Sequence, residues 1–104
     1  MKRTAKPKSI KLQQEERILE ISMELIGFEM DTREVLYNYG ESLSIKSKRN
    51  VCFVAKLSGE MQALEKYKNI LGYEDVLERA EKLLEEAQKL SNVVTKEVNA
   101  IAQQ

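Results

Sequence analysis

The sequence predicts an all-α protein of long antiparallel helices, either a three-helix bundle or a helical hairpin with coiled-coil-like packing. Two observations support this fold class. The 104 residues include only four glycines and one proline, Pro7, so little interrupts a helix. Apolar residues also recur every three or four positions along three segments, whereas the alternation typical of strands is absent. A chain of this length is expected to form one domain.

The first helix is expected over residues 12–40. Gly27 lies inside its apolar stripe and costs up to about 1 kcal/mol relative to alanine. The sequence DTRE at residues 31–34 also resembles a capping box, which would break the helix near residues 27–30. The stripe nevertheless keeps its spacing for three heptads, which favours one continuous helix. Its apolar members are Ile18, Ile21, Leu25, Phe28 and Val35.

The second helix is expected over residues 47–71, with Ser44 or Ser47 as its N-cap and Gly72 just beyond its end. Its stripe does not continue the phase of the first one, so a turn must separate the two helices. The stretch SLSIKSKRNVCFVAK, residues 42–56, has four positive charges and no negative one. We expect its basic residues to point outward and its apolar residues to point inward, including the lone cysteine as a small core residue. Those inward residues are Val51, Cys52, Phe53 and Val54.

The third helix is expected over residues 75–102. Asp75 and Glu78 have the spacing of a capping box at its start. Its stripe is the most regular of the three and includes two small alanines, which favour a closely packed neighbour. The stripe consists of Val76, Ala80, Leu83, Ala87, Leu90, Val94, Val98 and Ile101.

A chain with three long stripes and only six aromatic residues is expected to bury all of them by joining a second chain. The expected partner is a second copy in a homodimer, or a larger protein. The predicted interface consists of the stripes of the first and third helices: Ile18, Ile21, Leu25, Phe28, Val35, Leu83, Ala87, Leu90, Val94, Val98 and Ile101.

Charge is arranged in blocks, although the net charge is zero. Residues 1–14 hold five bases and no acid, and residues 15–41 hold eight acids against two bases. We expect residues 1–11 to form a basic flexible arm and residues 12–104 to form the helical domain. Basic residues in the arm and at the start of the second helix are candidates for contacting phosphates. These candidates are Lys2, Arg3, Lys6, Lys8, Lys46, Lys48 and Arg49.

Residues that support catalysis are scarce. Histidine is absent, Cys52 is the only cysteine, and the four glycines are too scattered for a phosphate-binding loop. We therefore expect no enzymatic activity and no cofactor. No apolar run is long enough to span a membrane, and no apolar segment follows the basic N-terminus as in a signal peptide. The expected location is the cytoplasm, including a host cytoplasm for a phage or viral protein.

The function predicted from the sequence is therefore a non-enzymatic protein–protein interaction module that acts through apolar helix stripes. Adaptors, chaperones, scaffolds and inhibitors all have this character. The alternative is a small nucleic-acid-associated protein that contacts phosphates through the arm and residues 46–49. The acidic first and third helices count against this alternative, because they would repel a duplex.

Overall fold

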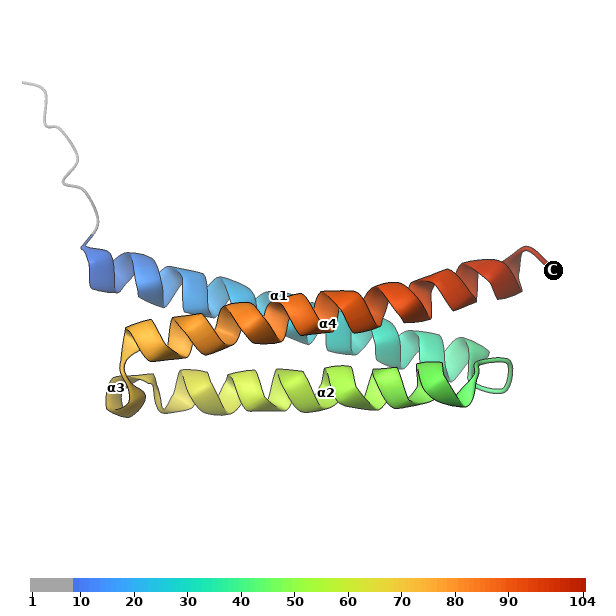
Figure 1. The fold of residues 1–104 in the computed structure, drawn as a ribbon, viewed down its shortest axis with the longest axis horizontal. Coiled ribbons are helices and arrows are strands. Elements are labelled where there is room, and N and C mark those ends of the chain that lie inside the picture. Colours follow the sequence, from blue (N-terminus) through green and yellow to red (C-terminus); the bar gives the residue numbers. More distant parts are fainter. Residues whose placement is uncertain (1–8) are drawn as a thin grey trace, which may run out of the picture.

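Three long helices lie side by side in the computed structural model, which describes residues 9–104 (Figure 1). The elements in chain order are α1 (Ile10–Tyr39), α2 (Ile45–Lys66), the single turn α3 (Lys68–Leu71) and α4 (Tyr73–Ala102). Helix α2 runs antiparallel to α1 and α4, which run in the same direction. The all-α prediction is confirmed. Of the two architectures considered, the structure has the three-helix bundle.

Local signals in the sequence explain the helix ends at the turn between α1 and α2. Helix α1 is continuous through Gly27, as predicted, and the capping-box sequence at 31–34 lies within it. Ser44 is the N-cap of α2, and its hydroxyl oxygen accepts a hydrogen bond from the Ser47 amide at 3.1 Å. The α1–α2 turn therefore ends at Ser44, one of the two serines expected to cap α2.

The other helix ends differ slightly from the prediction. Helix α1 begins at Ile10 instead of residue 12, because the Ser9 hydroxyl caps it and accepts from the Leu12 amide at 3.1 Å. Helix α2 ends at Lys66, and the one-turn α3 completes the expected range to residue 71. Gly72 follows with a φ of 97°, the left-handed conformation that glycine adopts easily. Helix α4 begins at Tyr73 instead of residue 75, and the predicted capping box was wrong, because Gly72 is the N-cap and Asp75 lies within the first turn.

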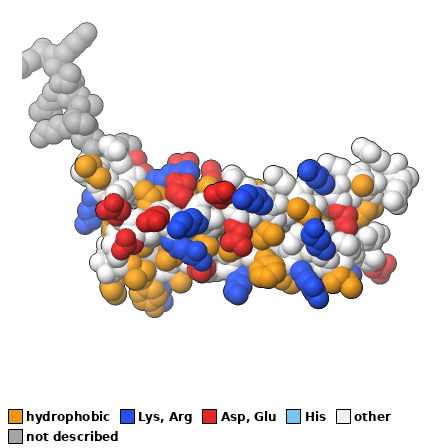
Figure 2. Space-filling view, in the orientation of Figure 1, with side chains coloured by type: hydrophobic (Ala, Val, Ile, Leu, Met, Phe, Trp, Pro, Cys, Tyr) orange, Lys and Arg blue, Asp and Glu red, His pale blue; other side chains and the backbone are white. Residues whose placement is uncertain are grey.

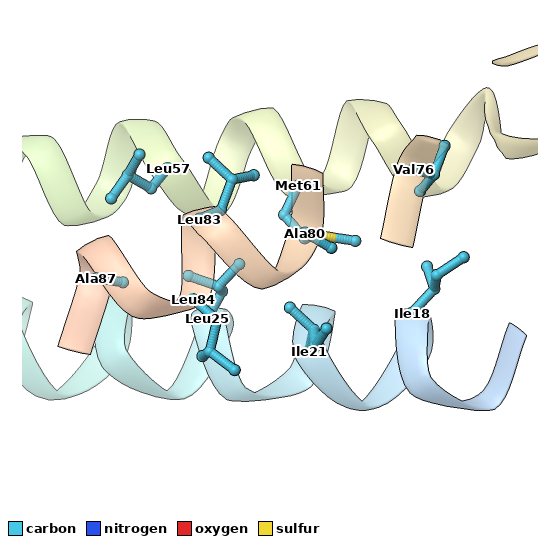
Figure 3. Close-up of a cluster of buried hydrophobic side chains, with 10 residues drawn as sticks. All are labelled: Ile18, Ile21, Leu25, Leu57, Met61, Val76, Ala80, Leu83, Leu84 and Ala87. Atoms are coloured by element: carbon cyan, nitrogen blue, oxygen red, sulfur yellow. The ribbon is translucent and has the colours of Figure 1, made fainter. Parts of the chain in front are cut away.

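The core lies where the inner stripes of the three long helices meet (Figure 3). Helix α1 contributes three side chains, α2 two and α4 five, and all ten are at least nine-tenths buried. Ala80 and Ala87 are fully buried. Their small side chains let α4 approach its neighbours closely, as expected from the sequence. The ten are Ile18, Ile21, Leu25, Leu57, Met61, Val76, Ala80, Leu83, Leu84 and Ala87.

Polar contacts at the surface connect α4 to the other two long helices. Arg17 on α1 donates to Glu81 on α4 at 2.8 Å, and this hydrogen bond raises the pKa of the guanidinium. At the other end of the bundle, the Ser44 amide donates to both carboxylate oxygens of Glu97, at 3.2 and 3.1 Å. Hydrogen bonds from Ser44 and Ser47 hold the pKa of Glu97 below its usual value. Glu97 thus places a negative charge at the N-terminus of α2, where the helix dipole favours it.

One buried side chain lacks a hydrogen-bonding partner within residues 9–104. The hydroxyl oxygen of Ser58 on α2 is completely buried and makes no hydrogen bond. By contrast, the buried Thr32 hydroxyl donates to the Phe28 carbonyl of its own helix at 2.8 Å. Ser58 is therefore an uncompensated polar group at the interior of the bundle.

Candidate functional site

The stripes that the sequence predicted as an interface lie between the helices of the same chain. Six of the eleven residues are fully or almost fully buried there: Ile18, Ile21, Leu25, Leu83, Ala87 and Val94. The other five are partly buried: Phe28, Val35, Leu90, Val98 and Ile101. The six buried residues therefore stabilise the bundle itself, and the role of the stripes in binding a partner stays a prediction.

A second apolar stripe runs along the solvent-facing side of α1. Its residues again recur every three or four positions, with a polar side chain in two slots, and they are exposed by 36% at Ile26 to 90% at Tyr37. At about 100° per residue, this stripe lies roughly opposite the face that α1 buries in the core. We call it the outer stripe: Leu12, Leu19, Met23, Ile26, Met30 and Tyr37.

Helix α1 is thus apolar on two opposite sides. Scattered single apolar residues on a surface are normal, but an aligned set on one helix resembles the seam of a coiled coil. The surface is hollowed towards the C-terminal end of the stripe, where Met30, Arg33, Glu34 and Tyr37 line a depression of about 380 Å³. The outer stripe was not predicted. The apolar residues of the outer stripe recur every three or four positions, which is the pattern that could have revealed it. The inner stripe of the same helix has the same spacing, so the two stripes are not distinguished by spacing alone.

Acidic side chains flank the outer stripe on both sides. In heptad terms, the positions beside the seam include Glu15, Glu20, Glu29 and Glu34. Glu20 and Glu34 are exposed, whereas Glu15 and Glu29 are half-buried and pair with Lys68 at 3.5 Å and Arg33 at 2.6 Å. A helix docked on this seam would therefore meet exposed acidic side chains along the edge that holds Glu20 and Glu34, whereas the acids of the other edge are paired within the chain.

A groove with the opposite charge lies on the first half of α2. Ile45 is 70% exposed and Phe53 is 49% exposed, and Cys52 is exposed between them. Together with three basic residues they border a shallow, open depression of about 450 Å³ along one face of α2. We call this the basic groove: Ile45, Lys48, Arg49, Cys52, Phe53 and Lys56. Figure 2 shows hydrophobic side chains among Lys and Arg side chains along this part of α2.

The basic groove occupies the stretch whose orientation was predicted from the sequence. Lys46, Lys48, Arg49 and Lys56 are exposed, as predicted. Val51 and Val54 are buried, also as predicted. The inward placement of Phe53 and the core position of Cys52 were wrong, because only one face of α2 contacts the bundle and both residues lie off that face. The phosphate-contacting candidates Lys2, Arg3, Lys6 and Lys8 lie outside the described residues.

The described part of the chain shows no arrangement typical of a metal site. Residues 9–104 contain no group of three or more cysteine, aspartate or glutamate side chains close enough to hold a metal ion. None of their helices is both long and apolar enough to cross a bilayer. Comparison of this chain with protein-family models, with curated proteins and with solved structures finds no match.

Proposed function

We propose that the protein is a non-enzymatic interaction module that binds a helical segment of a protein partner on the outer stripe of α1. The observation that supports this proposal is the alignment of Leu19, Met23, Ile26 and Met30 on the exposed side of a helix that already fills its share of the core. Covering such a seam with an apolar helix removes these side chains from water, which favours association by about 25 cal/mol per Å² before the costs of binding are subtracted.

Charge defines the chemistry of the partner. Because acidic residues flank the outer stripe, a docked helix is favoured when lysine or arginine flanks its own apolar seam.

Gly27 supports the same proposal. It lies beside the stripe in the middle of α1, and a Cβ built there meets no atom within 4 Å. Packing within the chain therefore gives no reason for a glycine, whereas a closely approaching partner helix would.

A synthetic helix tests this proposal directly. We would measure by fluorescence anisotropy the binding of a peptide of about 20 residues with a leucine seam and lysine flanks, a length near that of the stripe. The wild-type chain is expected to bind it, and the Met23→Glu/Met30→Glu variant is expected to bind at least about tenfold more weakly, since two charges would enter the seam. The same peptide with glutamate flanks should bind poorly.

A matched variant controls for the added negative charge. Gln88→Glu/Asn92→Glu places two carboxylates on exposed positions of α4, away from the outer stripe. This variant should bind the lysine-flanked peptide as the wild type does. Equal binding by the wild type and the stripe variant would mean that the peptide does not bind at the stripe, and tighter binding by both double variants would mean that it responds only to overall charge. Either result would refute the proposal.

The alternative function, nucleic-acid association, is favoured by one observation: Lys46, Lys48 and Arg49 are all exposed in the first turns of α2. A gel-shift titration at two salt concentrations tests it, because each phosphate neutralised on duplex DNA contributes about −0.9 to the log–log salt slope. Under this alternative, replacing Lys48 and Arg49 by serine weakens binding and reduces the slope. Absence of binding by the wild type at physiological salt would refute it.

A further inference from the structure

Each chain has both members of a complementary pair of surfaces. The outer stripe of α1 is apolar with acidic edges, and the basic groove of α2 is apolar with Lys48, Arg49 and Lys56 around it. The two surfaces lie on the outer faces of different helices, so they cannot meet within one molecule while the bundle is intact. Two molecules can bring them together.

Pairing of the outer stripe with the same stripe of another copy is disfavoured by charge. The exposed flanking residues of the stripe, Glu34 and Glu20, are both acidic, and Glu20 also pairs with Arg17 at 2.7 Å. Two such stripes would bring like charges together along this edge. Among the described residues, the basic groove offers both apolar contact and the opposite charge. Its Phe53 is a large, half-exposed aromatic side chain of the kind that anchors protein interfaces.

We propose that the protein self-associates by docking the outer stripe of α1 in one copy against the basic groove of α2 in another. This proposal rests on the proposed function and names a second copy of the chain as the partner. Apolar contact between the two surfaces supplies the attraction, while Lys48, Arg49 and Lys56 meet the acidic edges of the stripe and select this pairing over others.

The lengths of the two surfaces are compatible with this contact. The stripe from Leu12 to Tyr37 is about 38 Å long and the groove from Ile45 to Lys56 is about 17 Å long, at 1.5 Å per residue. The groove thus spans slightly less than half of the stripe and can cover its centre near Met23 and Ile26. Gly27 lies at this centre, where its missing side chain lets the two helices approach closely.

If two copies engage reciprocally, each supplies one stripe and one groove, and the contact is isologous and closes as a dimer. If the stripe of one copy meets the groove of the next without reciprocation, the contact is heterologous and continues into larger assemblies. Both outcomes raise the molar mass above the 12.0 kDa of one chain. Both also depend on the same opposite charges, so one set of charge variants tests either form.

A charge exchange between the two surfaces tests the proposal. One variant reverses the stripe edges (Glu20→Lys/Glu34→Lys), and the other reverses the groove (Lys48→Glu/Lys56→Glu). Molar mass would be measured by sedimentation equilibrium over a dilution series, with circular dichroism to verify that each variant is folded. Each variant alone is expected to self-associate at least about tenfold more weakly than the wild type, because like charges now face one another. An equimolar mixture of the two is expected to recover association, because each variant again offers the other an opposite charge.

A third variant controls for the change in net charge. Glu78→Lys/Glu85→Lys changes the charge of exposed positions on α4 by the same amount as the stripe variant and should associate as the wild type does. A wild-type chain that stays monomeric at about 100 μM, or a mixture that fails to recover association, would overturn self-docking. If the wild type is monomeric but still binds the lysine-flanked peptide through Met23 and Met30, self-docking fails while the proposed function stands.

Discussion

Replacing Ser58 with alanine should stabilise the protein. The Ser58 side chain is completely buried on α2, and its hydroxyl has no hydrogen-bonding partner within residues 9–104. Burying an unpaired polar group costs about 1–3 kcal/mol, and alanine also favours the helix by about 0.5 kcal/mol relative to serine. Since the two side chains differ by one oxygen atom, the substitution leaves almost no cavity. We expect the free energy of unfolding to increase by about 1–2 kcal/mol, a value near the lower end of the sum of these two contributions.

Urea denaturation monitored by circular dichroism would measure this change. With an m-value of about 1–1.5 kcal/mol/M for a chain of this size, the midpoint should rise by about 1 M while m stays constant. A constant m would show that the change affects stability and not the compactness of the unfolded chain.

Ser47→Ala is the matched control for this experiment. It makes the same chemical change at another buried position of α2, but the Ser47 side chain hydrogen-bonds to Glu97. Losing that bond should lower stability, so the two substitutions should have opposite signs. If Ser58→Ala lowers the midpoint instead, its hydroxyl makes a stabilising contact and our account of the α2 interior is incorrect.

Four further predictions concern other parts of the bundle. Leu83→Ala should lower the free energy of unfolding by about 2–5 kcal/mol, because Leu83 is fully buried in the core, and calorimetry should show a matching fall in Tm. Gly27→Ala should raise stability by about 0.5–1 kcal/mol in urea titrations of the monomeric chain, since a Cβ there meets open space. Gly72→Ala should instead lower stability by about 1 kcal/mol, because φ is 97° at that position. Because the folded-state pKa of Glu97 is lowered, its contribution is present at neutral pH and is lost as the pH falls below the ordinary glutamate value of about 4.3. Glu97→Gln should therefore lose less stability than the wild type between neutral pH and about pH 3, in unfolding titrations at each pH.

The fold could be predicted from the sequence because its signals are local or strictly periodic. Ser44 caps α2 as predicted, since the cap requires only a hydroxyl at the end of a turn. The inner stripes identified three helical segments and their core-facing sides. The end of α2 at Lys66 was missed because no glycine, proline or capping side chain lies there. The chain leaves the helix at that point to reach α4, which is a requirement of the tertiary structure.

The candidate site could be predicted only in part, because a periodic pattern identifies an apolar face without saying what covers it. On α1 two faces have the same spacing, and the sequence alone does not show which one packs against α2 and α4. The same ambiguity affected Phe53 and Cys52, which lie next to the buried Val54 in the sequence but point to solvent. The basic character of residues 46–56 was correctly placed on the surface, since lysine and arginine are rarely buried without a partner.

If the outer stripe binds a partner as proposed, the two apolar faces of α1 place natural variation along this helix under two separate selection pressures. Substitutions at inner positions such as Ile21 would change cellular abundance, because they alter the fraction of folded chains. Substitutions at outer positions such as Met23 would leave abundance nearly constant and change only the set of bound molecules. A saturation library of α1 sorted once for abundance and once for association should thus give two sensitivity profiles with the same helical period, displaced from one another by nearly half a turn. Variants that lose association without losing abundance would then mark the interface residue by residue.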